Sequence, residues 1–94
     1  MQNFIPSSYM TFATVEQDKQ RLSKFLGHFD EKEWKFDLSK VNLCDSAGIA
    51  LLLEAKRLSK AKKSHCHFVG ISDEMNALIQ FCGVEGILLK DNNC

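Results

Sequence analysis

The residues best suited to chemistry are Asp45 and Ser46, which stand with Ala47 and Gly48 between a short apolar stretch and a leucine-rich one. A helix that begins here presents unpaired backbone N–H groups and a partial positive charge, and Asp and Ser are common caps for such an end. Ala47 and Gly48 add little side chain, which leaves space for a neighbouring molecule. A phosphate on Ser46 would add roughly two negative charges, which the helix start tolerates but a docked partner would not. The pattern fits either a plain structural cap or a switchable docking site.

The leucine-rich stretch predicts a helix over residues 46–63. Steps of 100° per residue place four apolar side chains on one face, which we assign to the core: Leu51, Leu52, Ala55 and Leu58. Ile49 and Leu53 fall beside this stripe, next to lysines. We therefore expect both to be only partly covered and to belong to the docking surface.

The remaining periodic segments predict a small α/β domain. Helical spacing marks residues 14–26 and 72–82, and strand-like alternation or apolar runs mark 34–38, 41–44 and 65–69. Residues 87–89 are expected to pack on the core, and residues 1–12 to form a degenerate or frayed edge strand or hairpin around Pro6. Strands that alternate with helices favour a mixed, mostly parallel sheet with helices packed against it. We expect one domain over residues 1–94.

Composition excludes several classes of function. The 94 residues carry a formal net charge of zero, which argues against nucleic-acid binding, since phosphates demand a basic surface. The longest apolar run, residues 47–53, is too short to span a membrane, and the N-terminus lacks the basic start of a secretory leader. Four scattered cysteines favour reduced thiols in the cytoplasm.

Other chemistry-bearing residues do not form a recognisable site. His65 and His67 point away from Cys66 on a strand, so we expect no metal. Cys44 has no partner base, and a serine hydrolase would need a histidine that no motif places near Ser46. We therefore expect no cofactor and no enzymatic activity. The lysines and arginine within residues 56–63 predict a solvated helix face, with an acidic partner or anionic lipid headgroups as the alternative.

Four stretches, in this order and spacing, resemble the STAS domain family: FDLSKV at 36–41, DSAGIALLL at 45–53, AKK at 61–63 and VGI at 69–71. The family pattern is a strand ending in D-L-S-x-V, a D-[ST]-x-G-[LI] turn and a leucine-rich helix, and the resemblance extends over residues 34–88. The resemblance implies a non-enzymatic domain that binds another protein through Asp45, Ser46, Ala47, Gly48, Ile49 and Leu53.

Two branches of the family suggest two partners. The chain looks most like the MlaB-type subunit of the bacterial phospholipid-transporting ABC system, which implies binding to the transporter's ATPase subunit and a cytoplasmic position peripheral to the inner membrane. That branch also leads us to expect a bulky aromatic on the first helix, where only Phe25 is available and is assigned to the core. The alternative is an anti-sigma factor antagonist, which binds an anti-sigma kinase and is released when Ser46 is phosphorylated.

Overall fold

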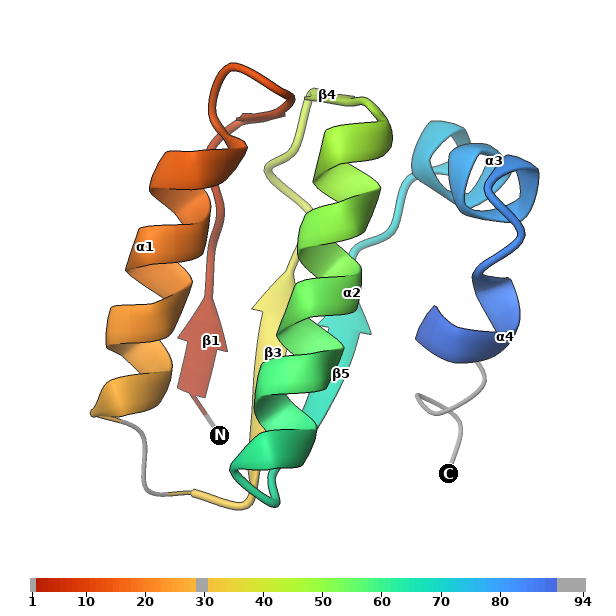
Figure 1. Ribbon diagram of the computed structural model, residues 1–94. Coiled ribbons are helices and arrows are strands. Elements are labelled where there is room, and N and C mark those ends of the chain that lie inside the picture. Colours follow the sequence, from red (N-terminus) through yellow and green to blue (C-terminus); the bar gives the residue numbers. More distant parts are fainter. Residues whose placement is uncertain (1, 29–30, 90–94) are drawn as a thin grey trace.

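The computed structural model describes residues 2–28 and 31–89, so Met1 and the last residues of the predicted 1–94 domain lie outside this description. Five strands and four helices occur within these ranges (Figure 1). In chain order they are β1 (Gln2–Phe4), β2 (Tyr9–Met10), α1 (Val15–Gly27), β3 (Glu33–Asp37), β4 (Leu43–Cys44), α2 (Ser46–Ala61), β5 (His65–Val69), α3 (Asp73–Phe81) and α4 (Glu85–Leu88).

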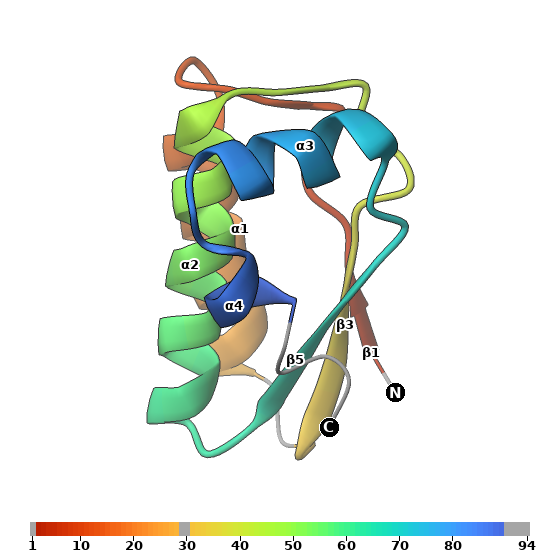
Figure 2. The ribbon, with the colours of Figure 1, turned by 90° about the vertical axis from the view of Figure 1, so that its right-hand side faces the viewer.

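The strands form two small parallel sheets. One has the order β1-β3-β5 and the other pairs β2 with β4. Helices α1 and α2 make the crossovers between the three strands of the larger sheet and lie on one of its faces (Figure 2). The predicted α/β class with a mostly parallel sheet is confirmed. The N-terminal segment forms an edge strand, β1, and not the hairpin that we considered, because β1 and β2 each pair with a later strand.

Aromatic side chains fill the space between the sheet and the helices. Trp34 and Phe36 of β3 are fully buried, as the alternating pattern predicts. Neighbouring aromatic rings extend this row, with centroids 5.2 Å apart for Phe4 and Phe36 and 5.5 Å apart for Phe36 and Phe68. The indole Nε1 of Trp34 donates a 2.5 Å hydrogen bond to the buried hydroxyl of Ser59, which satisfies the polar atom of this ring.

Helix α2 lies between α1 on one side and α3 and α4 on the other (Figure 1). Leu51, Leu52 and Ala55 are buried as predicted, whereas Leu58 is only partly buried. Ile49 is 2% exposed, so the prediction that it is only partly covered is wrong. The reason is that helices flank α2 on two sides, which widens its apolar stripe beyond the part that the sheet alone would cover.

Helix α1 carries a buried carboxylate that its charged sequence does not suggest. Asp18 is fully buried and accepts hydrogen bonds from the backbone N–H and the hydroxyl of Ser7, the latter at 2.7 Å. Arg21 pairs with Asp18 at 3.1 Å and also donates to the backbone carbonyl of Ile5. These bonds fasten the segment between β1 and β2 to α1.

The C-terminal helices cover the rest of the core beside α2. Ser72 caps α3 by accepting a 3.1 Å hydrogen bond from the Met75 N–H, and Met75 and Ile79 are buried. Of the segment 87–89 that was expected to pack on the core, Leu88 is buried and Leu89 packs partly against it, whereas Ile87 is exposed. Cys82, which continues the apolar spacing of α3, is exposed because the helix ends one residue before it.

Candidate functional site

Asp45 joins two segments of the chain at the beginning of α2. One carboxylate oxygen, Oδ1, accepts hydrogen bonds from the backbone N–H groups of Ala47 at 2.9 Å and Gly48 at 3.2 Å. The other, Oδ2, accepts from the backbone N–H of Phe12 at 3.0 Å. The Phe12 bond, together with the two helix bonds, lowers the pKa of Asp45 below its usual value. Asp45 therefore caps α2 and also holds the loop before α1 against the start of this helix.

Ser46 is exposed and follows the cap directly. Its hydroxyl makes no hydrogen bond to the residues that the structure describes, so it is available to a partner or a kinase. Ala47 is half-buried and lines a groove of about 230 Å³ between α1 and α2. The remaining lining is Val15, Glu16, Lys19, Ala50, Leu51 and Glu54.

Gly48 lies inside the protein. A Cβ added to it would lie 2.4 Å from the carbonyl oxygen of Met10 and 2.6 Å from Sγ of Cys44. The absence of a side chain therefore lets β2 and β4 approach the first turn of α2, and Gly48 offers no space to a partner.

The six predicted site residues do not form one surface. Asp45, Ser46 and Ala47 lie together at the start of α2, and Ile49 is in the core. Leu53 is half-buried and lines a different hollow, with Ile87 of α4. Helical spacing alone suggested a continuous surface, because it cannot tell which neighbours flank a helix.

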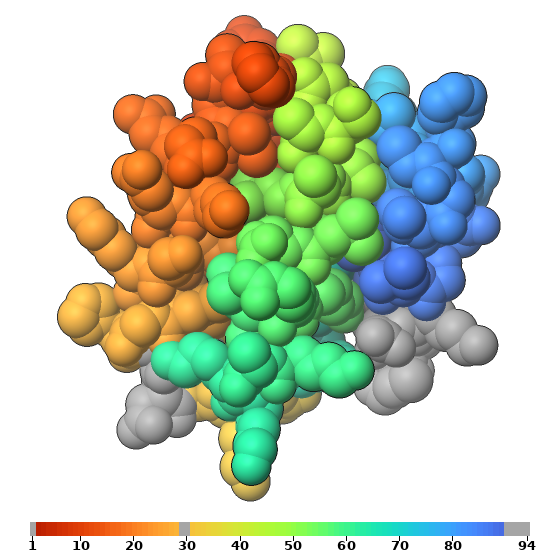
Figure 3. Space-filling view, viewed as in Figure 1, coloured from red at the N-terminus to blue at the C-terminus, as the bar shows by residue number. Residues whose placement is uncertain are grey.

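The sequence did not point to Phe12, an exposed aromatic residue whose backbone is bonded to Asp45. Phe12 is 85% exposed, although its backbone is held by Asp45. In Figure 3 the red-orange segment before α1 stands beside the yellow-green start of α2. Within α1 itself the sole aromatic is Phe25, which packs against Phe4 and Trp34 as assigned, so the expected exposed aromatic is not on this helix. One feature of the sequence could have indicated this exposure. Phe12 lies outside every segment with helical or strand-like spacing, so the periodicity does not assign it to the core.

Two other side chains near this end are exposed and apolar. Tyr9 of β2 and Leu43 of β4 are partners in the parallel register and are 54% and 56% exposed. Large exposed apolar side chains that gather on one part of a small domain are typical of interaction surfaces. We call Phe12, Ser46 and Ala47 the α2-start surface. In the sequence, Tyr9 lies three residues before Phe12, and Leu43 lies three residues before Ser46.

The cysteine next to this surface, Cys44, is not an activated thiol. Burial raises the pKa of the Cys44 thiol to about 11, so this cysteine is a neutral thiol near pH 7 and a poor nucleophile. Over residues 2–28 and 31–89, no three His, Cys, Asp or Glu side chains come together as a metal site requires. Within the same ranges, no helix is long and apolar enough to cross a membrane.

The parallel α/β fold and the capped, exposed helix start describe a small α/β domain, and comparison with known proteins supplies the family. The family model "Mlab, STAS domain" matches residues 7–90. No curated protein sequence matches the chain. Among solved structures, a sulfate transporter family protein from Wolinella succinogenes has the same fold with a TM-score of 0.76 at 18% identity, over 97% of this chain and 73% of that one.

The chain therefore belongs to the STAS domain family. Domains of this family act in protein interaction or regulation and are generally non-catalytic. The resemblance predicted from residues 34–88 is confirmed at this level, and the match extends it into the N-terminal segment.

Proposed function

We propose that this chain is a non-enzymatic interaction subunit that binds the ATPase subunit of an ABC transporter for phospholipids. In this role it supports the assembly or activity of a complex that moves phospholipids between membranes and maintains outer-membrane lipid asymmetry. The protein would then lie in the cytoplasm, peripheral to the inner membrane through its partner. The name of the matching family model supports this branch of the family.

The observation that carries the proposal is the α2-start surface. It joins the exposed aromatic residue Phe12, through the bond of its backbone N–H to Asp45, to the helix start that carries the exposed Ser46 and the half-buried Ala47. Aromatic side chains dominate the binding energy of many protein interfaces when a partner covers them, and small neighbours allow close approach. The proposed contacts are thus Phe12, Ser46 and Ala47, while Asp45 and Gly48 shape the surface from within.

Co-purification from the native organism tests the proposal. The wild-type chain should recover a transporter ATPase, and the variants Ser46→Arg and Phe12→Ala should each lose it. Ser23→Arg and Phe81→Ala are the matched controls, because Ser23 is an exposed serine on α1 and Phe81 is 88% exposed on α3. Recovery of the ATPase by Ser46→Arg and Phe12→Ala at the wild-type level would exclude this surface, and its absence from the wild-type sample would exclude the partner.

A regulatory switch is the second candidate, because the Ser46 hydroxyl is exposed at a helix start. A phosphate there would meet the positive end of α2 and the carboxylate of Asp45, so it would alter the surface without removing the cap. In this case the wild-type chain should recover an anti-sigma kinase, and Ser46→Asp should release it. Genes for a kinase and a sigma factor beside this one would favour regulation, whereas genes for an ATPase and a permease would favour transport.

A further inference from the structure

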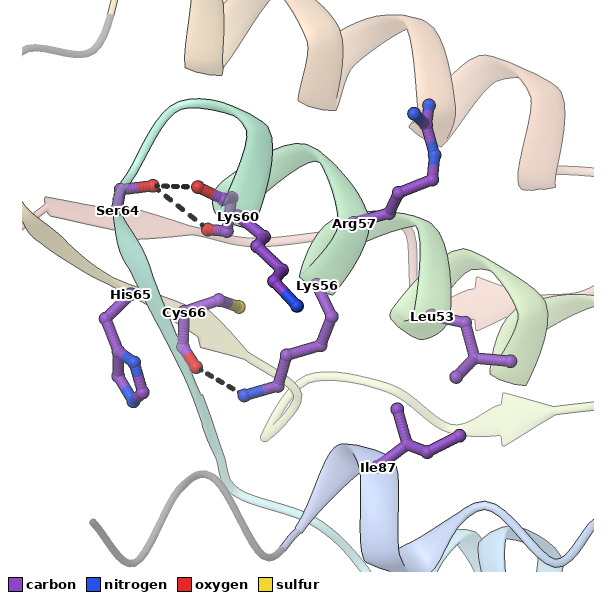
Figure 4. Close-up of a pocket in the computed structure, with 9 residues that line it drawn as sticks. Leu53, Lys56, Arg57, Lys60, Ser64, His65, Cys66 and Ile87 are labelled. Atoms are coloured by element: carbon purple, nitrogen blue, oxygen red, sulfur yellow. Dashed lines mark hydrogen bonds between the residues drawn. The ribbon is translucent and has the colours of Figure 1, made fainter.

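A second recess lies away from the α2-start surface, between α2, β5 and α4 (Figure 4). It has a volume of about 370 Å³ and is lined by Leu53, Lys56, Arg57, Ser59, Lys60, Ser64, His65, Cys66 and Ile87. Along a helix that rises about 1.5 Å per residue, Lys60 is about 21 Å from Ser46. The two regions can therefore be tested separately, and a ligand site in this recess does not depend on the proposed function.

The charged side chains in the described lining of this recess are all basic. Among its described lining residues are two lysines and an arginine but no Asp or Glu, although the whole chain has a net charge of zero. Arg57 is compensated, because its guanidinium donates to Glu54, and its side chain points away from the two lysines (Figure 4). The side chains of Lys56 and Lys60, by contrast, are directed toward the recess (Figure 4).

Lys56 and Lys60 are four residues apart on α2, and both point into the recess (Figure 4). Like charges at this spacing repel each other on a helix. Lys56 donates a 3.0 Å hydrogen bond to the Cys66 carbonyl and lies over the Phe68 ring, so its ammonium group is held in position. Lys60 is exposed and pairs with no acidic side chain that the structure describes. An anion beside the Lys60 ammonium group would balance its charge and reduce its repulsion of Lys56.

The other end of the recess is apolar. Leu53 of α2 and Ile87 of α4 face each other across it (Figure 4), and Ile87 is 55% exposed. A ligand that extended from the lysines to these side chains would therefore need a charged head and an apolar stem.

We propose that this recess binds an anionic amphiphile, a phosphate or carboxylate head on a short apolar chain. The head lies between Lys56 and Lys60, and the chain covers Leu53 and Ile87. Either a soluble amphiphile or the headgroup region of an anionic phospholipid supplies this chemistry.

Calorimetric titration with octyl phosphate, below the concentration at which it forms micelles, tests the proposal. The wild-type protein should bind it saturably, inorganic phosphate should bind more weakly, and octyltrimethylammonium, with the same chain and the opposite charge, should not bind. Equal binding of the cationic amphiphile would overturn the proposal, because the recess would then recognise only the apolar chain and not the charge of the head.

Matched variants test each end of the recess. Lys60→Glu should weaken octyl phosphate binding by about five- to tenfold. Its control is Lys24→Glu, since Lys24 is an exposed lysine in the last turn of α1 as Lys60 is in the last turn of α2. Ile87→Ala should weaken octyl phosphate about threefold and leave inorganic phosphate unchanged. Its control is Ile5→Ala, which removes an isoleucine that is 43% exposed elsewhere.

Wild-type affinity in Lys60→Glu, or an equal loss in Lys24→Glu, would overturn the assignment of the head site. Thermal unfolding of each variant verifies that it is folded. Flotation with phosphatidylglycerol vesicles then identifies the source of the ligand. Flotation that Lys60→Glu abolishes assigns a membrane headgroup, and binding of octyl phosphate without flotation assigns a soluble amphiphile.

Discussion

Gly48 and Asp45 show how single residues at one helix start serve the interior of the protein. Gly48 admits the Met10 carbonyl to the first turn of α2, and Asp45 accepts hydrogen bonds from both the helix and the loop before α1. Each was predicted to belong to a docking surface, and each contributes to that surface by positioning the backbone around it. Ser46 and Ala47 are the residues of this motif that a partner can touch.

Gly48→Ala should destabilise the protein by about 1–3 kcal/mol, because the new methyl group overlaps Met10 and Cys44. Helix propensity alone predicts the opposite result, because alanine stabilises a helix by about 1 kcal/mol relative to glycine. Urea unfolding followed by the fluorescence of Trp34, the only tryptophan, measures the change. Gly27→Ala is the control, since nothing lies within 4 Å of its added Cβ, and it should be neutral or stabilising. Equal stability of the two variants would contradict the packing described for Gly48.

Asp45→Asn should destabilise the protein by about 1 kcal/mol at pH 7. Asparagine caps helices as well as aspartate does, but its amide group replaces one of the two acceptor oxygens, so either the helix bonds or the Phe12 bond is lost.

The effect of Asp45→Asn should depend on pH. The folded protein lowers the pKa of Asp45, so the ionised carboxylate contributes stability above its unfolded pKa of about 3.9 and loses this contribution as the pH falls further. The difference between the variant and the wild type should therefore narrow below about pH 4. Asp73→Asn, at an exposed position in the first turn of α3, is the control and should change little. A gap that stayed constant from pH 7 to about pH 3 would contradict this role of Asp45.

The helices and strands followed from periodicity where one face of an element meets one neighbour. Helix α1 and strand β5 have the bounds that their spacing predicts, to within a residue or two. Periodicity was insufficient where an element meets several neighbours, as with Ile49 on α2. It was also uninformative for Phe12, which belongs to no regular element, and for Asp18, whose burial depends on the distant Ser7.

The hydrogen bond between Trp34 and Ser59 links β3 to α2, so its loss should weaken the packing of these two elements. Ser59→Ala should destabilise the protein by about 1–3 kcal/mol, because it removes an acceptor from a fully buried indole N–H. Ser23→Ala, at an exposed position on α1, should be neutral or slightly stabilising. Chemical denaturation measures both variants, and a neutral Ser59→Ala would show that the hydrogen bond has no net value.

At the scale of the whole molecule, the sheets and helices enclose one shared cluster of buried side chains. This cluster includes Phe4 near the N-terminus and Leu88 in the last helix. The Cα radius of gyration is 12.1 Å, close to the value of about 12 Å expected for a compact domain of this length. The predicted division of the chain, a single domain, is compatible with these dimensions.

A single domain should unfold in one cooperative transition. Trp34 fluorescence reports the centre of the sheet, and far-ultraviolet circular dichroism reports all the helices, so the two midpoints in urea should coincide. Separate midpoints would show that α3 and α4 melt independently of the β1-β3-β5 sheet and would contradict the single-domain prediction.

The hydrogen bond from Phe12 to Asp45 joins residues 33 positions apart and orders a loop before any partner arrives. A partner that covers the phenyl ring therefore does not have to freeze that loop, and the conformational entropy lost on association is smaller than for a mobile aromatic. The resulting gain in affinity should appear mainly as slower dissociation, because affinity differences among related complexes lie mostly in the dissociation rate. The same carboxylate thus couples folding stability to the residence time of a complex.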